Sequence, residues 1–183
     1  NDILERTIRT GRYEVTGVVP TSSPSMDIQV SSNFERLLFD AHGRDAGAVR
    51  RMMAGLAQSK SFSIGEAALA SIRSEFAAAR ADEAEVSGMI KATLGEAGYL
   101  LDPHTAVGLV AARKVAADTA VPTVVLSTAH PAKFPDAVEA ASGTRPALPA
   151  WLGNLMEREE RIAHLPNAQA AVEAYVLEKT RAA

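Results

Sequence analysis

Apolar residues recur three and four positions apart along most of the first hundred residues, which is the spacing of one helix face. Segments with this spacing are separated by glycines, by polar runs or by residues that cap helices. The pattern predicts five helices, at 2–10, at about 32–42, from Asp45 to before the polar residues 58–60, at 66–80 and at 83–97.

Local signals set the expected ends of these helices. Asn1 is a candidate cap for the first helix, and Gly11 is its expected stop. Residues 32–35 have the spacing of a capping box. Gly95 and Gly98 should end the fifth helix, because glycine readily adopts the left-handed conformation that closes a helix.

Two segments have strand character. Residues 13–24 carry valines followed by a polar turn, which predicts a strand or a loop. Residues 121–126, VPTVVL, are apolar on both faces and form the clearest strand pattern in the chain. A helix from His104 or Thr105 to about Asp118 precedes them, so we expect a central parallel strand with a ligand at its carboxyl end.

Three further helices are expected, at about 135–142, 149–162 and 167–181. One strong strand cannot form a sheet, because a central strand needs neighbours on both sides. The sequence offers at most two or three weaker candidates for that role. The predicted fold class is therefore α/β, mostly helical, with few parallel strands and the remainder of the sheet outside this chain.

Composition narrows the classes of function. The chain has 183 residues, with 19 Lys and Arg against 22 Asp and Glu, which is enough for one globular domain. Its net charge of −3 argues against a nucleic-acid partner. The absence of cysteine excludes a disulfide framework and a thiolate metal site, and a cytoplasmic location is expected. We expect no membrane association, because the sequence has neither a signal peptide nor an apolar run of about 18–20 residues.

The chain starts at Asn1, without an initiator Met, and enters a helical pattern at once. A free terminus is usually poorly ordered, whereas this one resembles the first turn of a helix. We therefore expect the chain to be a piece of a longer protein.

Searches for common chemical motifs find no Gly-rich phosphate loop, HExxH, GxSxG or acidic calcium loop, and no metal site is expected. His42 and His164 lie at expected helix ends and are interpreted as structural. Lys60 is interpreted as a solvated loop residue, and residues 22–27 as a turn leading into a strand.

Two segments carry candidate chemistry. Residues 102–105, DPHT, open a helix, so Asp102 is either a helix cap or part of a site that combines a carboxylate with an imidazole. Residues 127–133, STAHPAK, follow the expected strand and place a hydroxyl, an imidazole and an ammonium group in one short loop. Loops after buried strands are usually polar, so both interpretations remain open here as well.

Five motifs in order give the sequence a family resemblance. They are NDIL at 1–4, SPSMDI at 23–28, SNFER at 32–36, LDPHTA at 101–106 and LSTAHPAKF at 126–134. Together they resemble threonine synthases of the bacterial and fungal type, and the resemblance covers the whole chain but only the C-terminal part of such enzymes.

The resemblance implies a parent enzyme of the pyridoxal-phosphate-dependent fold type II, like the tryptophan synthase β subunit. Such a lyase converts O-phospho-L-homoserine and water to L-threonine and phosphate by β,γ-replacement. About 1–100 would be a strand or loop and then a helical segment. About 101–183 would be a helix-strand-helix part of the cofactor domain plus C-terminal helices.

The resemblance also implies which residues take part. The Schiff-base lysine and the phosphate loop would lie upstream, in SFKD-type and GNFG-type motifs that this sequence lacks, so no catalytic residue is expected here. Thr128 would face the pyridine nitrogen of pyridoxal phosphate, with Asp102 near the same ring edge. His104, His130 and Lys133 would contact the substrate phosphate or the partner half.

Two hypotheses follow for this polypeptide. In the first, it is an inactive part of threonine synthase whose partner is the N-terminal half of the same protein. The alternative is a non-catalytic helical interaction module derived from a pyridoxal-phosphate enzyme. In either case, the uncovered apolar run at 121–126 predicts self-association or retention of the N-terminal half.

Overall fold

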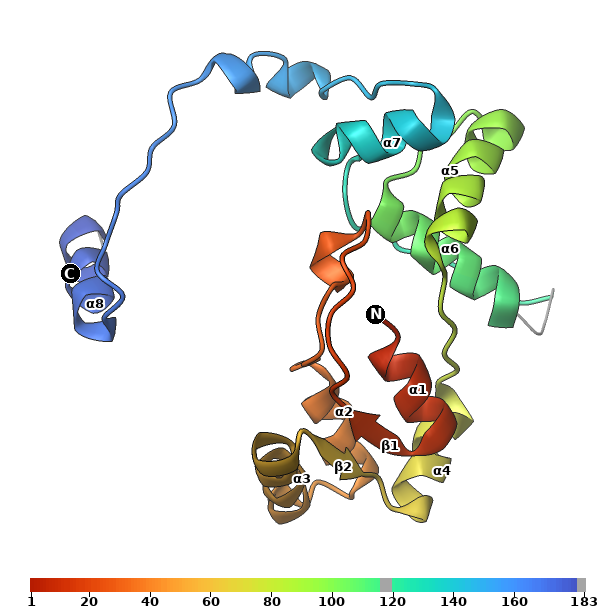
Figure 1. Cartoon of the computed structure of the whole chain (residues 1–183), viewed down its shortest axis with the longest axis vertical. Helices are drawn as coiled ribbons and strands as arrows, with labels where there is room; N and C mark the ends of the chain where they lie inside the picture. The colour runs from red at the N-terminus through yellow and green to blue at the C-terminus, as the bar shows by residue number, and fades with distance from the viewer. Residues whose placement is uncertain (116–119, 181–183) are drawn as a thin grey trace. The chain divides into compact units, whose positions relative to one another are not determined.

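The computed structural model describes residues 1–115 and 120–180, and the chain forms two compact units, Asn1–Ala147 and Leu148–Ala183. Figure 1 labels the helices and strands of both units. The elements of the first unit are α1 (Ile3–Thr10), β1 (Arg12–Glu14), α2 (Phe34–Ala41), α3 (Ala46–Ser59), β2 (Ser61–Ser63), α4 (Glu66–Glu75), α5 (Glu83–Ala97), α6 (Pro103–Val115) and α7 (Pro135–Ser142). All five helices predicted in the first hundred residues are confirmed.

The first core cluster packs helices α1 to α4 around a two-stranded sheet (Figure 1). β1 pairs antiparallel with β2, and Tyr13 lies opposite Phe62. Their rings stack at 4.8 Å between centroids, and Phe34 also stacks with Tyr13, at 6.1 Å. Leu38 and Ile72 complete this core and are almost fully buried. The cluster therefore contains its own sheet and covers it with its own helices.

The second core cluster lies between α5, α6 and α7. Val86 and Ile90 of α5 pack with Ala106 of α6 and with Leu101, which precedes that helix. Residues 76–82 connect the two clusters in an extended conformation, so α4 ends at Glu75 and not near residue 80 as predicted. Their alanine-rich sequence favours helix, but the chain has to span the distance between the two cores.

Helix caps show where local signals were sufficient. Asp45 caps α3 by accepting the Gly47 N–H, and Asp82 forms a complete capping box with Glu85 at the start of α5. The capping box expected at 32–35 is wrong, because α2 begins at Phe34 without a side-chain cap.

The expected cap of α1 is also wrong. Asp2, not Asn1, occupies the N-cap position of this helix. The side chain of Asn1 bonds instead to the backbone of Val19 and to the carboxylate of Asp27, so tertiary contacts take it away from the helix end.

Residues 121–126 do not form the predicted parallel strand within this chain, and the described strands, β1 and β2, are antiparallel. The segment is extended but has no strand beside it to share backbone hydrogen bonds. Val124 is 80% exposed and Leu126 75% exposed, while Val125 lies against Gly108 of α6. The preceding helix begins at Pro103, and its expected end near residue 118 lies outside the described residues.

The second unit contains two 3-10 turns, Ala150–Leu152 and Leu155–Glu157, followed by α8 (Gln169–Lys179). The helix predicted at 149–162 is wrong. Short helices gain most of their stability from packing, and no residue between 148 and 180 is buried. In the parts of the chain that are described, no helix is long and apolar enough to cross a membrane.

Candidate functional site

A buried carboxylate organises the N-terminal end of α6. Asp102 is 1% exposed. Its Oδ1 accepts the backbone N–H groups of His104 and Thr105 at 2.9 and 3.4 Å, and its Oδ2 accepts the Thr105 hydroxyl. Asp102 therefore does cap the helix, and it also contacts both side chains that follow Pro103.

His104 connects this carboxylate to the loop that contains SPSMDI. Its Nε2 accepts the Ser25 N–H at 3.2 Å. Nδ1 lies 3.2 Å from Asp102 Oδ1 but forms no hydrogen bond with any described residue. Phe134 packs against the ring, with 4.6 Å between centroids.

Thr105 connects the same carboxylate to the loop after residue 126. Its Oγ1 accepts the Thr128 N–H at 3.2 Å while its own proton goes to Asp102. The structure thus brings Asp102, His104 and Thr128 together, with Thr105 as the link. The sequence places Thr105 at the start of a helix, and no local pattern signals its bond to residue 128.

The two remaining candidates, His130 and Lys133, lie on the same loop as Thr128 but not in this hydrogen-bonded group. All three residues are exposed. His130 Nδ1 accepts the Ala132 N–H at 3.1 Å and caps the turn Pro131–Lys133. Lys133 Nζ lies 5.5 Å from the centroid of the Phe134 ring. These side chains are therefore accessible to a ligand.

A cavity of about 620 Å³ lies next to the SPSMDI loop, and this loop, α1 and the start of α5 line it. Asp27 accepts Thr21 N–H and Oγ1–H, both at 2.7 Å, and the Asn1 amide at 2.6 Å. Burial would raise the pKa of Asp27, but the hydrogen bonds from Thr21 and Asn1 outweigh it and lower that pKa below its usual value. The sequence gives no sign of this cluster, because its members come from positions up to 26 residues apart.

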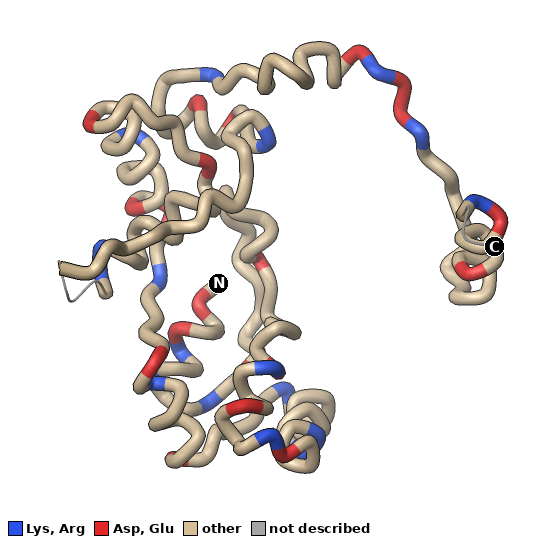
Figure 2. Tube along the Cα trace, turned by 180° about the vertical axis from the view of Figure 1, so that it is seen from behind, with Lys and Arg blue, Asp and Glu red and all other residues tan. Residues whose placement is uncertain are grey.

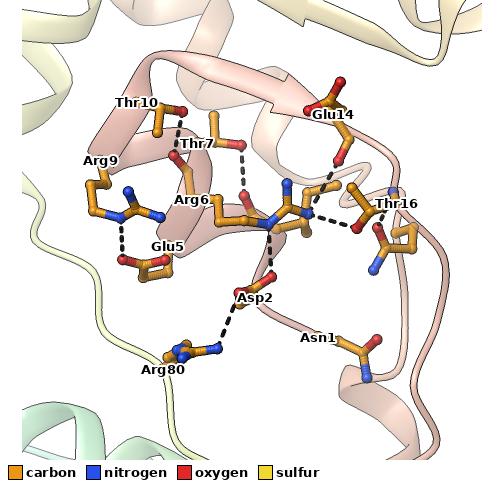
Figure 3. Close-up of polar contacts among 12 residues, drawn as sticks. Asn1, Asp2, Glu5, Arg6, Thr7, Arg9, Thr10, Glu14, Thr16 and Arg80 are labelled. Carbon is orange, nitrogen blue, oxygen red and sulfur yellow. Dashed lines mark hydrogen bonds and ion pairs between the residues drawn. The ribbon is translucent and has the colours of Figure 1, made fainter.

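The same cavity is bordered by an ionic group at the start of α1 (Figure 3). Arg6 Nε lies 2.8 Å from Asp2 Oδ1, and Arg80 reaches the other oxygen at 3.5 Å. The hydrogen bond from Arg6 lowers the pKa of Asp2. Arg6 also donates to the Glu14 carbonyl and the Thr16 hydroxyl, so it joins the helix to the chain after β1.

The other residues considered from sequence have structural surroundings. His42 ends α2, with Nδ1 2.7 Å from the Leu38 carbonyl, as interpreted. Lys60 closes α3 in the left-handed conformation and precedes β2, a strand that the sequence did not predict. His164 is exposed, and the helix predicted at 149–162, which it was expected to end, is not formed. Figure 2 shows basic and acidic positions interspersed along the trace, and among the described residues no group of three or more His, Asp or Glu could hold a metal.

Comparison with known proteins gives consistent results. The family model described as "Threonine synthase, C-terminal" matches residues 105–176. Threonine synthase from Pseudomonas aeruginosa is 46% identical over 177 residues, which cover 96% of this chain and 38% of that protein. Threonine synthase from Corynebacterium glutamicum is 36% identical, covering 97% of this chain and 38% of that protein.

Solved structures agree. A crystal structure of PLP-bound threonine synthase from Brucella melitensis aligns with a TM-score of 0.88 and 57% identity, covering 98% of this chain and 39% of that one. Yeast threonine synthase aligns with a TM-score of 0.80 and 31% identity, covering 97% and 40%. The chain therefore spans about two fifths of the length of the relatives it matches, and the alternative of a separate non-catalytic module is not favoured.

Proposed function

The chain belongs to the threonine synthase family, and from this premise we propose that it forms the C-terminal part of a pyridoxal-phosphate-dependent threonine synthase, the parent protein. The parent would convert O-phospho-L-homoserine and water to L-threonine and phosphate. The observation that carries this proposal is the 57% identity and TM-score of 0.88 with a PLP-bound threonine synthase along nearly the whole chain.

Within the parent, Thr128 presents its hydroxyl to the pyridine nitrogen of the cofactor. Among the described residues this hydroxyl has no hydrogen-bond partner, although the backbone N–H of the same residue is bonded to Thr105. A fixed backbone with an uncommitted hydroxyl fits a ring nitrogen. Bound pyridoxal phosphate supplies the electron sink of the reaction, and a neutral hydroxyl partner moderates that sink compared with a carboxylate.

The other candidates take supporting roles in the proposal. Asp102 acts through Thr105 and His104, since both of its oxygens are already bonded to them. His130 and Lys133 are exposed near the Thr128 loop and carry groups that can bind an anion, so the substrate phosphate is their expected ligand. His104 is the weaker candidate for that ligand, because its Nε2 already accepts from Ser25.

The Schiff-base lysine and the loop that binds the cofactor phosphate belong to the other part of the parent in this proposal. That part also covers the apolar segment 121–126 and supplies its neighbouring strands, because an extended apolar segment is unstable in water without a partner. Without that part, we expect the chain to self-associate. A cytoplasmic location remains our prediction.

One pair of experiments tests the function. After borohydride reduction with pyridoxal phosphate, the parent should carry the cofactor on one specific lysine. This chain alone, treated in the same way, should show no lysine that is labelled specifically. In the parent, Thr128→Ala should lower kcat by about tenfold or more through loss of one hydrogen bond. Thr128→Ser, which keeps the hydroxyl, should stay close to wild type. Threonine formation by this chain alone, or unchanged kcat in Thr128→Ala, would contradict the proposal.

A further inference from the structure

The start of α6 holds two loops that are far apart in sequence. Each loop is held by a hydrogen bond to a residue that contacts the Asp102 carboxylate. The Ser25 N–H bonds to His104 Nε2, 79 residues away, and the Thr128 N–H bonds to Thr105 Oγ1, 23 residues away. His104 and Thr105 both lie against Asp102. The site therefore depends on one buried group for the position of both loops.

The hydrogen bonds through Thr105 can run in one direction only. The Thr128 N–H can only donate, so Thr105 Oγ1 must accept it, and the hydroxyl of Thr105 donates its single proton to Asp102 Oδ2. A lone pair of Thr105 Oγ1 is then left for the Thr128 N–H at 3.2 Å. Thr105 is 4% exposed, and polar contacts that are shielded from water in this way resist exchange with solvent.

The segment that leads into Thr128 has few other contacts in the described chain. Residues 121–126 have no strand partner in the described chain, and their apolar side chains are mostly exposed. Val125 packs beside Gly108, where a Cβ would lie 3.3 Å from its methyl carbon. The bond from the Thr128 N–H to Thr105 therefore fixes the backbone of the same residue whose hydroxyl is exposed.

We propose that Thr105 is a positioning residue of the site, whose hydroxyl, oriented by Asp102, holds the Thr128 backbone so that the Thr128 hydroxyl is presented in one place. Thr105 itself touches neither cofactor nor substrate. This inference rests on the proposed role of Thr128, but its structural half concerns this chain alone and can be measured without any ligand.

The structural half is tested on this chain by amide hydrogen exchange, resolved by NMR at Thr128 and Ser25. Thr105→Val removes the hydroxyl at nearly constant volume, and Thr128 should then exchange about tenfold faster, the effect of losing one hydrogen bond. Thr105→Ser should restore protection. Ser25 should be unaffected by both variants, because its bond runs through His104.

Two more variants complete the structural test. Thr93→Val is the matched control, since Thr93 Oγ1 is buried in α5 without a hydrogen-bond partner, and exchange at Thr128 should not change. Asp102→Asn should accelerate exchange at both Thr128 and Ser25, because both loops depend on this carboxylate. If Thr105→Val is not folded, Thr105→Ala takes its place and must give the same acceleration.

The functional half is tested in the parent. Thr105→Val should lower kcat about tenfold with little change in KM, and Thr105→Ser should recover it. Unchanged exchange at Thr128 in the valine variant overturns the inference, and so does altered exchange with unchanged kcat in an active parent. A wild-type parent without threonine synthase activity would instead refute the proposed function and leave the exchange result standing.

Discussion

Apolar side chains are buried in the first core cluster but exposed in the second unit. Around β1 and β2, large apolar residues such as Leu38 and Ile72 are at most 1% exposed. In the second unit, Trp151 is 77% exposed and Leu177 74% exposed. Neighbouring elements of this chain therefore cover the apolar side chains of the first region, whereas those of the second stay exposed to solvent.

The difference lies in what surrounds each segment, not in its hydrophobicity. β1 finds a partner in β2, and helices α1 to α4 cover the pair on this chain. Residues 121–126 are more strand-like in sequence than either, yet no described strand lies beside them. A segment with high strand propensity therefore forms a strand only where a second strand supplies the backbone hydrogen bonds.

Truncating the same residue type in the two regions should give the largest contrast. Leu38→Ala removes a side chain that is 0% exposed and should lower the free energy of unfolding by about 3 kcal/mol. Leu177→Ala, its matched control in α8, should change it by less than about 0.5 kcal/mol. Urea unfolding followed by circular dichroism measures both. Equal effects would mean that the two regions do not differ as described.

The helix caps should give a smaller contrast. Asp82→Ala removes the capping box of α5 and should cost about 1 kcal/mol of stability in the same urea assay. Asn33→Ala is the control, because Asn33 occupies an N-cap position but its side chain accepts from Arg36 and not from the helix backbone. A cost for Asn33→Ala as large as that for Asp82→Ala would refute the assignment of the capping box.

The ionic group at α1 should give the smallest effect, and one that depends on pH. The folded pKa of Asp2 is lowered by Arg6, so its contribution is present above the unfolded pKa of about 3.9 and is lost as pH falls through the lower folded value. Asp2→Asn should cost about 0.5 kcal/mol at pH 7 and nothing below both pKa values.

The exposed pair of Asp40 and Arg44 provides the control for this measurement. These residues have the same spacing of four but side chains that are 61% and 78% exposed. Asp40→Asn should therefore leave stability unchanged at pH 7. A larger pH-dependent loss in Asp40→Asn than in Asp2→Asn would contradict the assignment of the Asp2 contacts as the stabilising pair.

Much of the fold could be predicted because its signals are local. The helix start at Asp45 and the stops at Gly11 and Gly98 depend on residues within one helical turn, and the structure confirms them. The helix expected at 149–162 is wrong for the opposite reason. Its helical pattern needs an apolar face to pack on, and the described second unit buries no residue.

The candidate site could be predicted only in part. Asp102 and Thr128 stand out by their positions beside a helix start and after an apolar run, and the structure brings the two segments together. Thr105 carries no such signal, because a threonine in the first turn of a helix is common and its partner is 23 residues away. The Asn1 and Asp27 contact is hidden for the same reason, since it joins segments that only the fold brings together.

We propose that this chain is one part of a threonine synthase and that the rest of the parent covers the exposed residues 121–126. Hydrogen exchange followed by mass spectrometry, on this chain alone and on the parent, tests it most directly at residues 121–126. We predict fast exchange at 121–126 in the chain alone, against slow exchange in α2, and at least a hundredfold slowing of 121–126 in the parent, roughly the effect of joining a stable sheet. Equal exchange of residues 121–126 in the two proteins would contradict the account.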